Sequence, residues 1–175
     1  MLNNRAKRCF RAKEMVVSIG DVCDKIFLIE KGMLRNFYYD RKGNDITHWF
    51  ASEHMIMTIP PSFFKREPSN FGIEAIEDTI VQAMSFHQME EELKKSIKLE
   101  RFYRLLATDI MIMLGRKVID LQTQTAEYRY DQLLQTHPDI FQRAKLGDIA
   151  GYLGIKQQSL SRIRKLKRYG KHFLT

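Results

Sequence analysis

Residues 145–168 read KLGDIAGYLGIKQQSLSRIRKLKR, and this stretch decides the fold of the C-terminal part of the chain. Its apolar residues follow helical spacing in two runs, which are Leu146, Ile149, Ala150 and Leu153, and then Leu160, Ile163 and Leu166. Gly154 lies between the runs and can adopt the positive φ that ends a helix. Ala150 is small enough for two helices to approach, and Leu160 can pack back across the corner. The spacing therefore predicts a helix-turn-helix.

The outward face of the second predicted helix carries polar and basic side chains that can contact nucleic acid. We assign the side chains that project from its first half and middle to base edges, namely Gln157, Gln158 and Arg162. Four others are assigned to phosphates, namely Ser161, Lys165, Lys167 and Arg168. The alternative interpretation is an ordinary helical hairpin whose charges are only solvated.

The distribution of charge favours the DNA-binding interpretation. Residues 141–175 contain nine Lys or Arg and one Asp, a net charge of +8, whereas residues 1–140 contain twenty residues of each sign. The whole formal charge of the chain therefore lies in its last fifth. A basic module on an otherwise neutral chain is typical of proteins that bind nucleic acid.

Three segments resemble the Crp/Fnr family of bacterial transcription regulators. DIAGYLGIKQQSLSRIRK at 148–165 is similar to the family's recognition helix, which contains a Leu-Ser-Arg run. AEYRYDQLLQTHPDIFQ at 126–142 is similar to the helix before it, and DKIFLIEKGMLRNFYYDRKGNDIT at 24–47 to the N-terminal β-roll. The resemblance implies a homodimer that binds a palindromic operator, with RNA polymerase as a further candidate partner. It also implies that Arg162 reads a base, and Gln158 replaces the usual Glu, which favours adenine at that step.

Residues 15–85 read as β-structure. Runs rich in β-branched and aromatic residues are separated by turn formers, and the runs are MVVSI, KIFLIE, MLRNFYYD, DITHWFA and TIVQAMSF. Alternation along the third run places Arg35, Asn36 and Tyr38, or their neighbours, on the solvent side of a half-buried antiparallel sheet. The basic cluster at Arg5, Lys7, Arg8, Arg11 and Lys13 is expected to be a solvated, poorly ordered terminus.

The segment between Phe50 and Phe71 breaks this pattern and contains three prolines, so we expect a long loop with one helical turn. The resembled family holds a cyclic nucleotide here with a Gly-Glu pair and an Arg-Ser or Arg-Thr pair. This sequence departs from that pattern, because Ser69 and Asn70 occupy the Arg-Ser positions and Glu53 lacks the preceding glycine. Arg66 is the remaining candidate guanidinium. We therefore expect cyclic AMP to bind weakly or not at all, while another small-molecule effector at Glu53, Arg66, Ser69 and Asn70 stays open.

A long helix is predicted from Leu99 to Leu121, with a stripe at spacings of three and four in which Lys117 is the one charged residue. A second apolar set widens the face beyond what one domain would cover. We expect a dimer interface formed by Tyr103, Leu106, Ile110, Met113, Leu114 and Leu121. Burial of the helix within one monomer is the alternative. The predicted division is 1–98 for the effector-sensing roll, 99–121 for the dimerisation helix and 122–175 for the DNA-binding domain.

Enzymatic, metal and membrane functions find no support in the sequence. The five histidines and two cysteines show no metal-binding spacing, and no catalytic constellation can be named, although a haem bound by one histidine stays a minor alternative. No apolar run could span a membrane, so we expect a cytoplasmic protein without a certain cofactor. The predicted fold is α+β, with an antiparallel β-roll, a long helix and a winged-helix-like helix-turn-helix. The functional alternative to a DNA-binding regulator is a ligand-binding or protein-interaction module that no longer reads DNA.

Overall fold

The computed structural model describes residues 6–172, with side chains described as far as Lys167. The chain has the predicted α+β fold. Its strands are β1 (Ala6–Phe10), β2 (Met15–Val17), β3 (Lys25–Lys31), β4 (Leu34–Tyr39), β5 (Asp45–Ala51), β6 (Ile56–Met57), β7 (Gly72–Ala75) and β8 (Thr79–Ser85). They form two antiparallel sheets, in the orders β1-β8-β3-β6 and β2-β7-β4-β5. Side chains between the two sheets form the core of a β-roll.

Arg5 lies outside the described residues, but the rest of the basic N-terminal stretch differs from the expectation of a poorly ordered terminus. Residues 6–10 form β1, which pairs along its whole length with β8, from Ala6 opposite Ala83 to Phe10 opposite Thr79. Phe10 also packs against the core of the roll. The charges remain in solvent, but the backbone hydrogen bonds and one aromatic anchor hold the strand in the sheet.

Strand β4 is also more buried than the alternation predicted. Arg35 and Asn36 were placed on the solvent side, yet their exposed fractions are 6% and 5%. The reason is tertiary: β4 lies between β5 and β7, with the core on one face and a helix of the C-terminal domain over the other. A sequence pattern does not reveal a second covering layer.

The helices are α1 (Pro60–Lys65), α2 (Phe86–Lys95), α3 (Ile97–Thr123), α4 (Ala126–Thr136), α5 (Ile140–Arg143), α6 (Leu146–Tyr152) and α7 (Gln157–His172). The predicted loop between Phe50 and Phe71 contains α1, the expected helical turn, and also the short strand β6. Among the described residues no strand follows α7, so the winged-helix-like domain shows its helices only.

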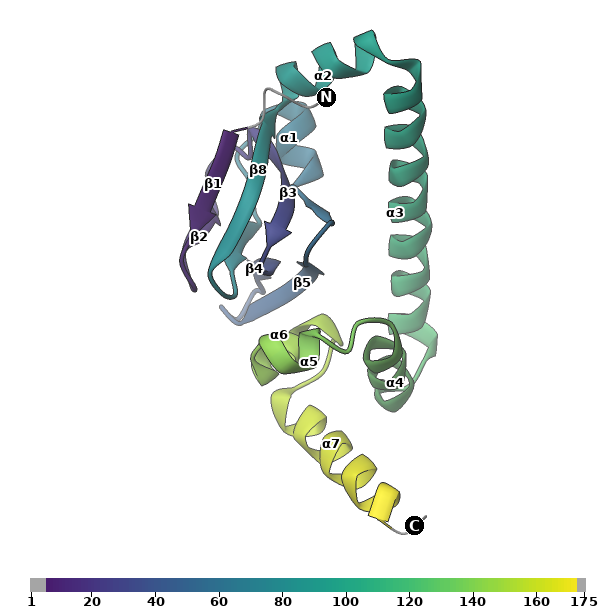
Figure 1. The fold of residues 1–175 in the computed structure, drawn as a ribbon. Coiled ribbons are helices and arrows are strands. Elements are labelled where there is room, and N and C mark those ends of the chain that lie inside the picture. Colours follow the sequence, from purple (N-terminus) through teal and green to yellow (C-terminus); the bar gives the residue numbers. More distant parts are fainter. Residues whose placement is uncertain (1–5, 173–175) are drawn as a thin grey trace.

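Figure 1 shows how the elements are arranged. The roll lies on one side, α2 crosses one end of it, and the long helix α3 runs back beside the sheets. The C-terminal helices lie at the other end of the roll, with α6 against β5, and α7 projects away from the body. Their core is continuous with the roll, because Met33 and Phe50 belong to the same buried cluster as Leu133, Ile149 and Leu160.

Candidate nucleic-acid interface

Helices α6 and α7 and the turn between them lie where the spacing predicted them. Gly154 has φ +67°, and the Ile155 N–H donates to the Ala150 carbonyl at 3.0 Å. Ala150, Leu160 and Ile163 are buried, with exposed fractions of 2% or less. Leu166 differs, because it lies beyond the end of this core and is 62% exposed. The first two turns of α7 are therefore fixed against the domain by buried apolar side chains.

The predicted base-reading side chains lie on one exposed face of α7. Gln158, Ser161 and Arg162 are exposed, and so is Lys165 one turn further along the helix. Gln157 is exposed as well, although its amide oxygen lies 3.4 Å from the position that a Cβ would take at Gly147. The structure thus brings these five predicted DNA contacts together on the exposed side of α7.

The last two predicted phosphate contacts differ from these five. Lys167 forms an ion pair with Asp131 of α4. It follows the buried Leu160 by seven residues, or two helical turns, so it faces the body of the domain. The side chain of Arg168 lies outside the described residues.

Helix α6 is held against the roll by close packing and by Arg35. A Cβ at Gly151 would lie 3.0 Å from the Thr47 backbone nitrogen, so the helix touches β5 directly. The Arg35 guanidinium donates to Asp45 and Glu74, each at 2.6 Å, and to Asp148 of α6 at 3.3 Å. Burial alone would lower the pKa of Arg35, but these hydrogen bonds raise it overall, so Arg35 stays charged.

Arg143 of α5 forms a second ionic cluster between the helical domain and the roll. Its guanidinium donates to both oxygens of Glu53 at 3.0 Å, to Asp139 at 3.2 Å and to Glu77. The hydrogen bonds from Arg143 lower the pKa of Glu53 to about 2. The sequence signals nothing about either cluster, because their partners are up to 113 residues apart along the chain.

Lys117 connects three elements where α3, the roll and α6 meet. Its ammonium group donates to the His48 carbonyl at 2.5 Å and lies 3.6 Å from the ring centroid of Tyr152 in α6. The Trp49 ring is also close, with its centroid 5.6 Å from the nitrogen. Burial lowers the pKa of Lys117 to about 7. Burial, with a smaller contribution from Lys117, also lowers the pKa of His48. In the sequence, the only indication of this junction was a lysine in an otherwise apolar stripe.

The predicted ligand residues make contacts within the protein. Glu53 binds Arg143 and accepts a hydrogen bond from the Gly32 N–H at 2.7 Å. Arg66 lies over the Phe63 and Phe86 rings, 5.5 Å and 5.2 Å from their centroids. Ser69 is buried and its hydroxyl accepts from the Phe71 N–H, whereas Asn70 is exposed.

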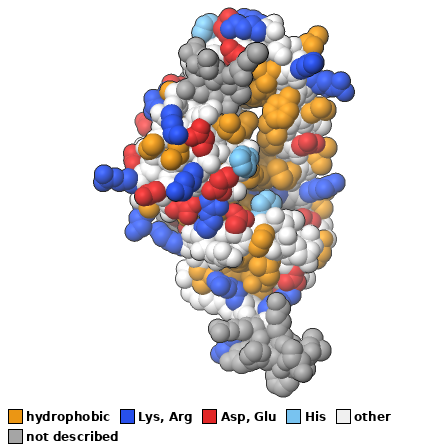
Figure 2. Space-filling view, in the orientation of Figure 1, with side chains coloured by type: hydrophobic (Ala, Val, Ile, Leu, Met, Phe, Trp, Pro, Cys, Tyr) orange, Lys and Arg blue, Asp and Glu red, His pale blue; other side chains and the backbone are white. Residues whose placement is uncertain are grey.

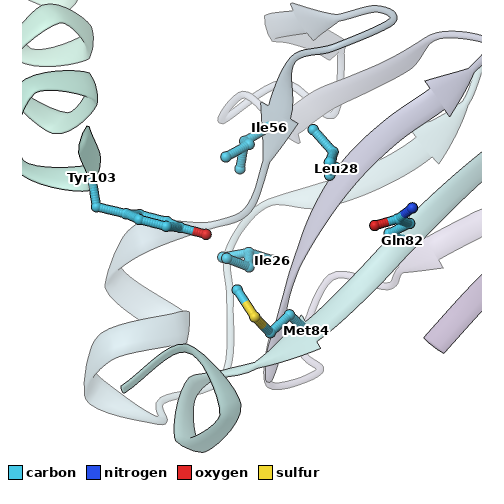
Figure 3. A pocket seen from close by; sticks show the side chains of 6 residues that line it. All are labelled: Ile26, Leu28, Ile56, Gln82, Met84 and Tyr103. Atoms are coloured by element: carbon cyan, nitrogen blue, oxygen red, sulfur yellow. The ribbon is translucent and has the colours of Figure 1, made fainter. Parts of the chain in front are cut away.

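A small pocket lies elsewhere, between α3 and the sheet that contains β3 and β8. Figure 3 shows Tyr103 reaching from α3 toward this sheet, opposite side chains that are mostly apolar. The other residues that line the pocket are Ile26, Leu28, Ile56, Gln82 and Met84. Because Tyr103 faces its own roll here, it is the predicted dimer residue with the clearest contact inside the monomer.

Helix α3 leaves most of its apolar surface uncovered. None of its 27 residues is buried, and apolar side chains line it along the face seen in Figure 2. Of the predicted interface residues, Tyr103 and Leu106 are half-buried, while Ile110, Met113, Leu114 and Leu121 are exposed. A neighbouring stripe is more exposed still, with Met111 at 66% and Val118 at 54%.

The described part of the chain brings together no group of three His, Cys, Asp or Glu side chains that could hold a metal ion. Within it, no helix has the length and apolar character needed to cross a membrane.

Solved structures share this fold at low sequence identity. The chain is similar to FixK2 from Bradyrhizobium japonicum, with 17% identity, a TM-score of 0.78, and coverage of 95% of this chain and 86% of that one. A CooA mutant from Carboxydothermus hydrogenoformans gives 16% identity, a TM-score of 0.76, and coverage of 98% and 78%. A protein from Eubacterium rectale assigned to the Crp/Fnr family gives 15% identity, a TM-score of 0.71, and coverage of 96% and 80%.

The sequence itself gives a family assignment. No curated protein matches it. Residues 7–96, which are the roll and α2, match the family described as cyclic nucleotide-binding domain. Since this match spans just over half of the 175 residues, the chain belongs to the cyclic nucleotide-binding domain family.

Proposed function

We propose that the protein is a transcription regulator of the Crp/Fnr type that binds double-stranded DNA as a homodimer. The observation that carries this proposal is the exposed face of α7, on which Gln158, Ser161, Arg162 and Lys165 lie together. A helix fixed at its start, with one exposed polar and basic face, is the element that helix-turn-helix proteins place in the major groove. The shared fold with a protein assigned to the Crp/Fnr regulators supports the same function.

The base contacts follow from the position of each side chain on α7. Arg162 can donate two hydrogen bonds to guanine, and the amides of Gln157 and Gln158 can pair with adenine. Because Gln157 leans toward Gly147, it has to rotate outward before it can reach a base. Arg162 and Gln158 are therefore the stronger base readers.

The phosphate contacts are sequence-independent. Ser161 and Lys165 lie beside the base-reading residues and can bind the DNA backbone on either side of the groove. Lys167 would first have to leave Asp131, so its contribution depends on the exchange of one exposed ion pair for another. Arg168 is assigned to a phosphate by its position in the sequence alone.

Dimerisation is proposed from the uncovered surface of α3. A helix of 27 residues without one buried side chain exposes apolar groups that a partner helix would cover. This surface has two adjacent stripes. One contains the predicted residues Ile110, Met113, Leu114 and Leu121, and the other contains the more exposed Met111 and Val118. Two copies of α3 packed side by side would place two α7 helices in successive major grooves, about 34 Å apart.

The roll is proposed to respond to an effector other than cyclic AMP, or to none. A cyclic phosphate needs a guanidinium and free backbone donors. Here the predicted guanidinium, Arg66, lies over two aromatic rings, and the Ser69 hydroxyl accepts a backbone hydrogen bond. A phosphate bound by Arg66 would have to draw the guanidinium away from these rings.

Binding titrations on DNA test the proposal. Selection from random DNA with the full chain supplies a preferred site, and affinities are then measured on that site and on scrambled DNA at two salt concentrations. Arg162→Ala should cost on the order of 1–3 kcal/mol on the preferred site only. Lys165→Ala should weaken both DNAs alike and reduce the salt slope by about one unit.

Lys94→Ala is the matched control, because Lys94 lies on α2 at the opposite end of the molecule from α7 (Figure 1). It should leave both affinities unchanged. If the wild type does not distinguish the selected site from scrambled DNA, the protein is better described as a ligand-binding or protein-interaction module.

A further inference from the structure

We propose that Lys117 is a positioning residue that fixes the helix-turn-helix domain relative to α3 and thereby sets the spacing between the half-sites that a dimer binds. The inference rests on the proposed DNA-binding function. Lys117 does not lie on the DNA-binding face of α7. It acts through the helices that it joins, so its effect should be on the separation of the two half-sites and not on the bases within each half-site.

The contacts of Lys117 come from both bodies that have to be held together. From the roll, the His48 carbonyl accepts a hydrogen bond at 2.5 Å, and the Trp49 ring lies beside the ammonium group. From the helical domain, the Tyr152 ring lies 3.6 Å away, a distance at which a cation is strongly attracted to an aromatic face. One side chain of α3 thus contacts β5 and α6 at the same point.

The site suits a long side chain with a hydrogen-bond donor, and in its charged form that donor is also attracted to the two rings. A carbonyl oxygen and the faces of two aromatic rings all carry partial negative charge, and none of them is a carboxylate. In the described part of the chain, Lys117 has no acidic partner that could satisfy it instead. An ammonium group this enclosed has only these contacts to offset its loss of water. Movement of α6 away from α3 would therefore remove the closest aromatic contact of this half-buried ammonium group.

The position of α6 determines the position of α7. Tyr152 is the last residue of α6, and the turn that follows holds Leu153 and Gly154 close to α3 and α4. The Arg129 guanidinium of α4 donates to the Leu153 carbonyl at 3.0 Å and to the Gln124 carbonyl at 2.6 Å. Leu121 of α3 packs on Gly154. Lys117 lies one turn before Leu121, so the last turns of α3 contact both the end of α6 and the turn from which α7 starts.

The consequence for DNA follows from symmetry. If α3 lies along the dimer axis, any shift of α6 relative to α3 occurs twice, once in each subunit, and changes the distance between the two α7 helices. One base pair corresponds to about 3.4 Å of rise, so displacements of a few ångströms are enough to favour a different spacing. A firmly held α6 should make the protein discriminate between spacings, and a loosened one should make it tolerant.

The test compares Lys117→Met, Lys117→Arg and Arg116→Met in the full-length protein. Met keeps the length of the side chain but has no charge and no donor, whereas Arg keeps both. Arg116 is the exposed neighbour on α3 and serves as the matched control for loss of a positive charge. Affinities are measured on the selected operator and on variants with one base pair added to or removed from its centre.

We expect Lys117→Met to reduce the discrimination between spacings by about threefold to thirtyfold, the range that one cation–π contact is worth. The ratio of affinities for correct and altered bases within a half-site should not change. Lys117→Arg should retain most of the discrimination, and Arg116→Met all of it. The inference is overturned if Lys117→Met is still a dimer of the same mass and discriminates between half-site spacings as well as the wild type does.

Trp49 provides a readout that does not depend on DNA. It is the only tryptophan of the chain, and its ring lies 6.3 Å from the Tyr152 ring and beside Lys117. Lys117→Met should shift its fluorescence emission and increase its quenching by acrylamide, while Arg116→Met should do neither. If the wild type binds no DNA, the proposed function fails, and the Trp49 result still decides whether Lys117 holds α6. No change at Trp49 would overturn the positioning role itself.

Discussion

Replacement of Arg35 by Met tests how strongly one buried cation holds the helical domain on the roll. The side chain of Arg35 is 8% exposed, and its guanidinium contacts Asp45 of β5, Glu74 of β7 and Asp148 of α6. Met is also a long, unbranched side chain, but it carries no charge. The three carboxylates would then face one another without the cation that now separates them.

The expected loss of stability is large for a single substitution. Removal of one partner from a buried ion pair costs about 3–5 kcal/mol, because the other charge stays buried and unpaired. Asp45 is 39% exposed, so water screens part of its charge, and we expect a loss of about 3 kcal/mol. The loss should shrink as the pH falls, since protonated carboxyl groups no longer repel one another. Burial already raises the pKa of Asp148, so this recovery should begin at mildly acidic pH.

Urea unfolding followed by circular dichroism at about pH 7 and about pH 5 measures both effects. Arg41→Met is the control, because Arg41 is an exposed residue in the turn between β4 and β5. Arg35→Lys should recover part of the loss, since Lys keeps the charge but cannot reach three carboxylates. A loss in Arg35→Met no greater than that in Arg41→Met, or one that does not depend on pH, would refute the reasoning.

Three further outcomes are expected. The melting temperature of the wild type should rise between about pH 7 and about pH 10, because Lys117 loses its proton near pH 7 in the folded protein but keeps it to higher pH in the unfolded chain. Lys117→Met should flatten this rise. The protein should be a dimer by light scattering, and Leu114→Asp should release monomers that Thr108→Asp does not. Cyclic AMP should give no heat of binding in calorimetry; low-micromolar affinity that Arg66→Ala abolishes would show that the loop does bind a cyclic phosphate.

The helix-turn-helix could be predicted from the sequence because its requirements are local. Ala150, Gly154 and Leu160 occupy fixed offsets within eleven residues, and each has one physical task at the corner. The strands of the roll were equally accessible, since β-branched runs between turn formers need no information from elsewhere. Both features depend on neighbours along the chain.

Residues whose environment comes from distant segments could not be predicted in this way. Arg35 alternates like a solvent-facing residue, and only the docking of α6 buries it. Glu53 was a candidate ligand residue, and its partner in the structure is Arg143, ninety positions away. Periodicity reports which side of a strand a residue occupies. It does not report what covers that side.

Lys117 shows the same limit in a stripe that was otherwise interpreted as apolar. A single lysine in such a stripe is usually tolerated because its charged end can reach water along the flexible stem. Here the stem leads to a carbonyl and two rings contributed by β5 and α6. The stripe predicted an interface for α3, but the lysine marks where the partner is the chain's own roll and helical domain.

The charge distribution has a structural consequence that the net charges alone conceal. Within the basic C-terminal segment, Arg143 is bound by Glu53 and Glu77 of the roll. The Arg143 side chain is only 20% exposed, so salt screens this cluster less than it screens the exposed face of α7. Rising ionic strength should therefore weaken contacts to DNA phosphates well before it opens the junction between domains. The two sets of basic residues therefore differ: Arg143 holds the helical domain on the roll, and the exposed residues of α7 are the ones proposed to bind DNA.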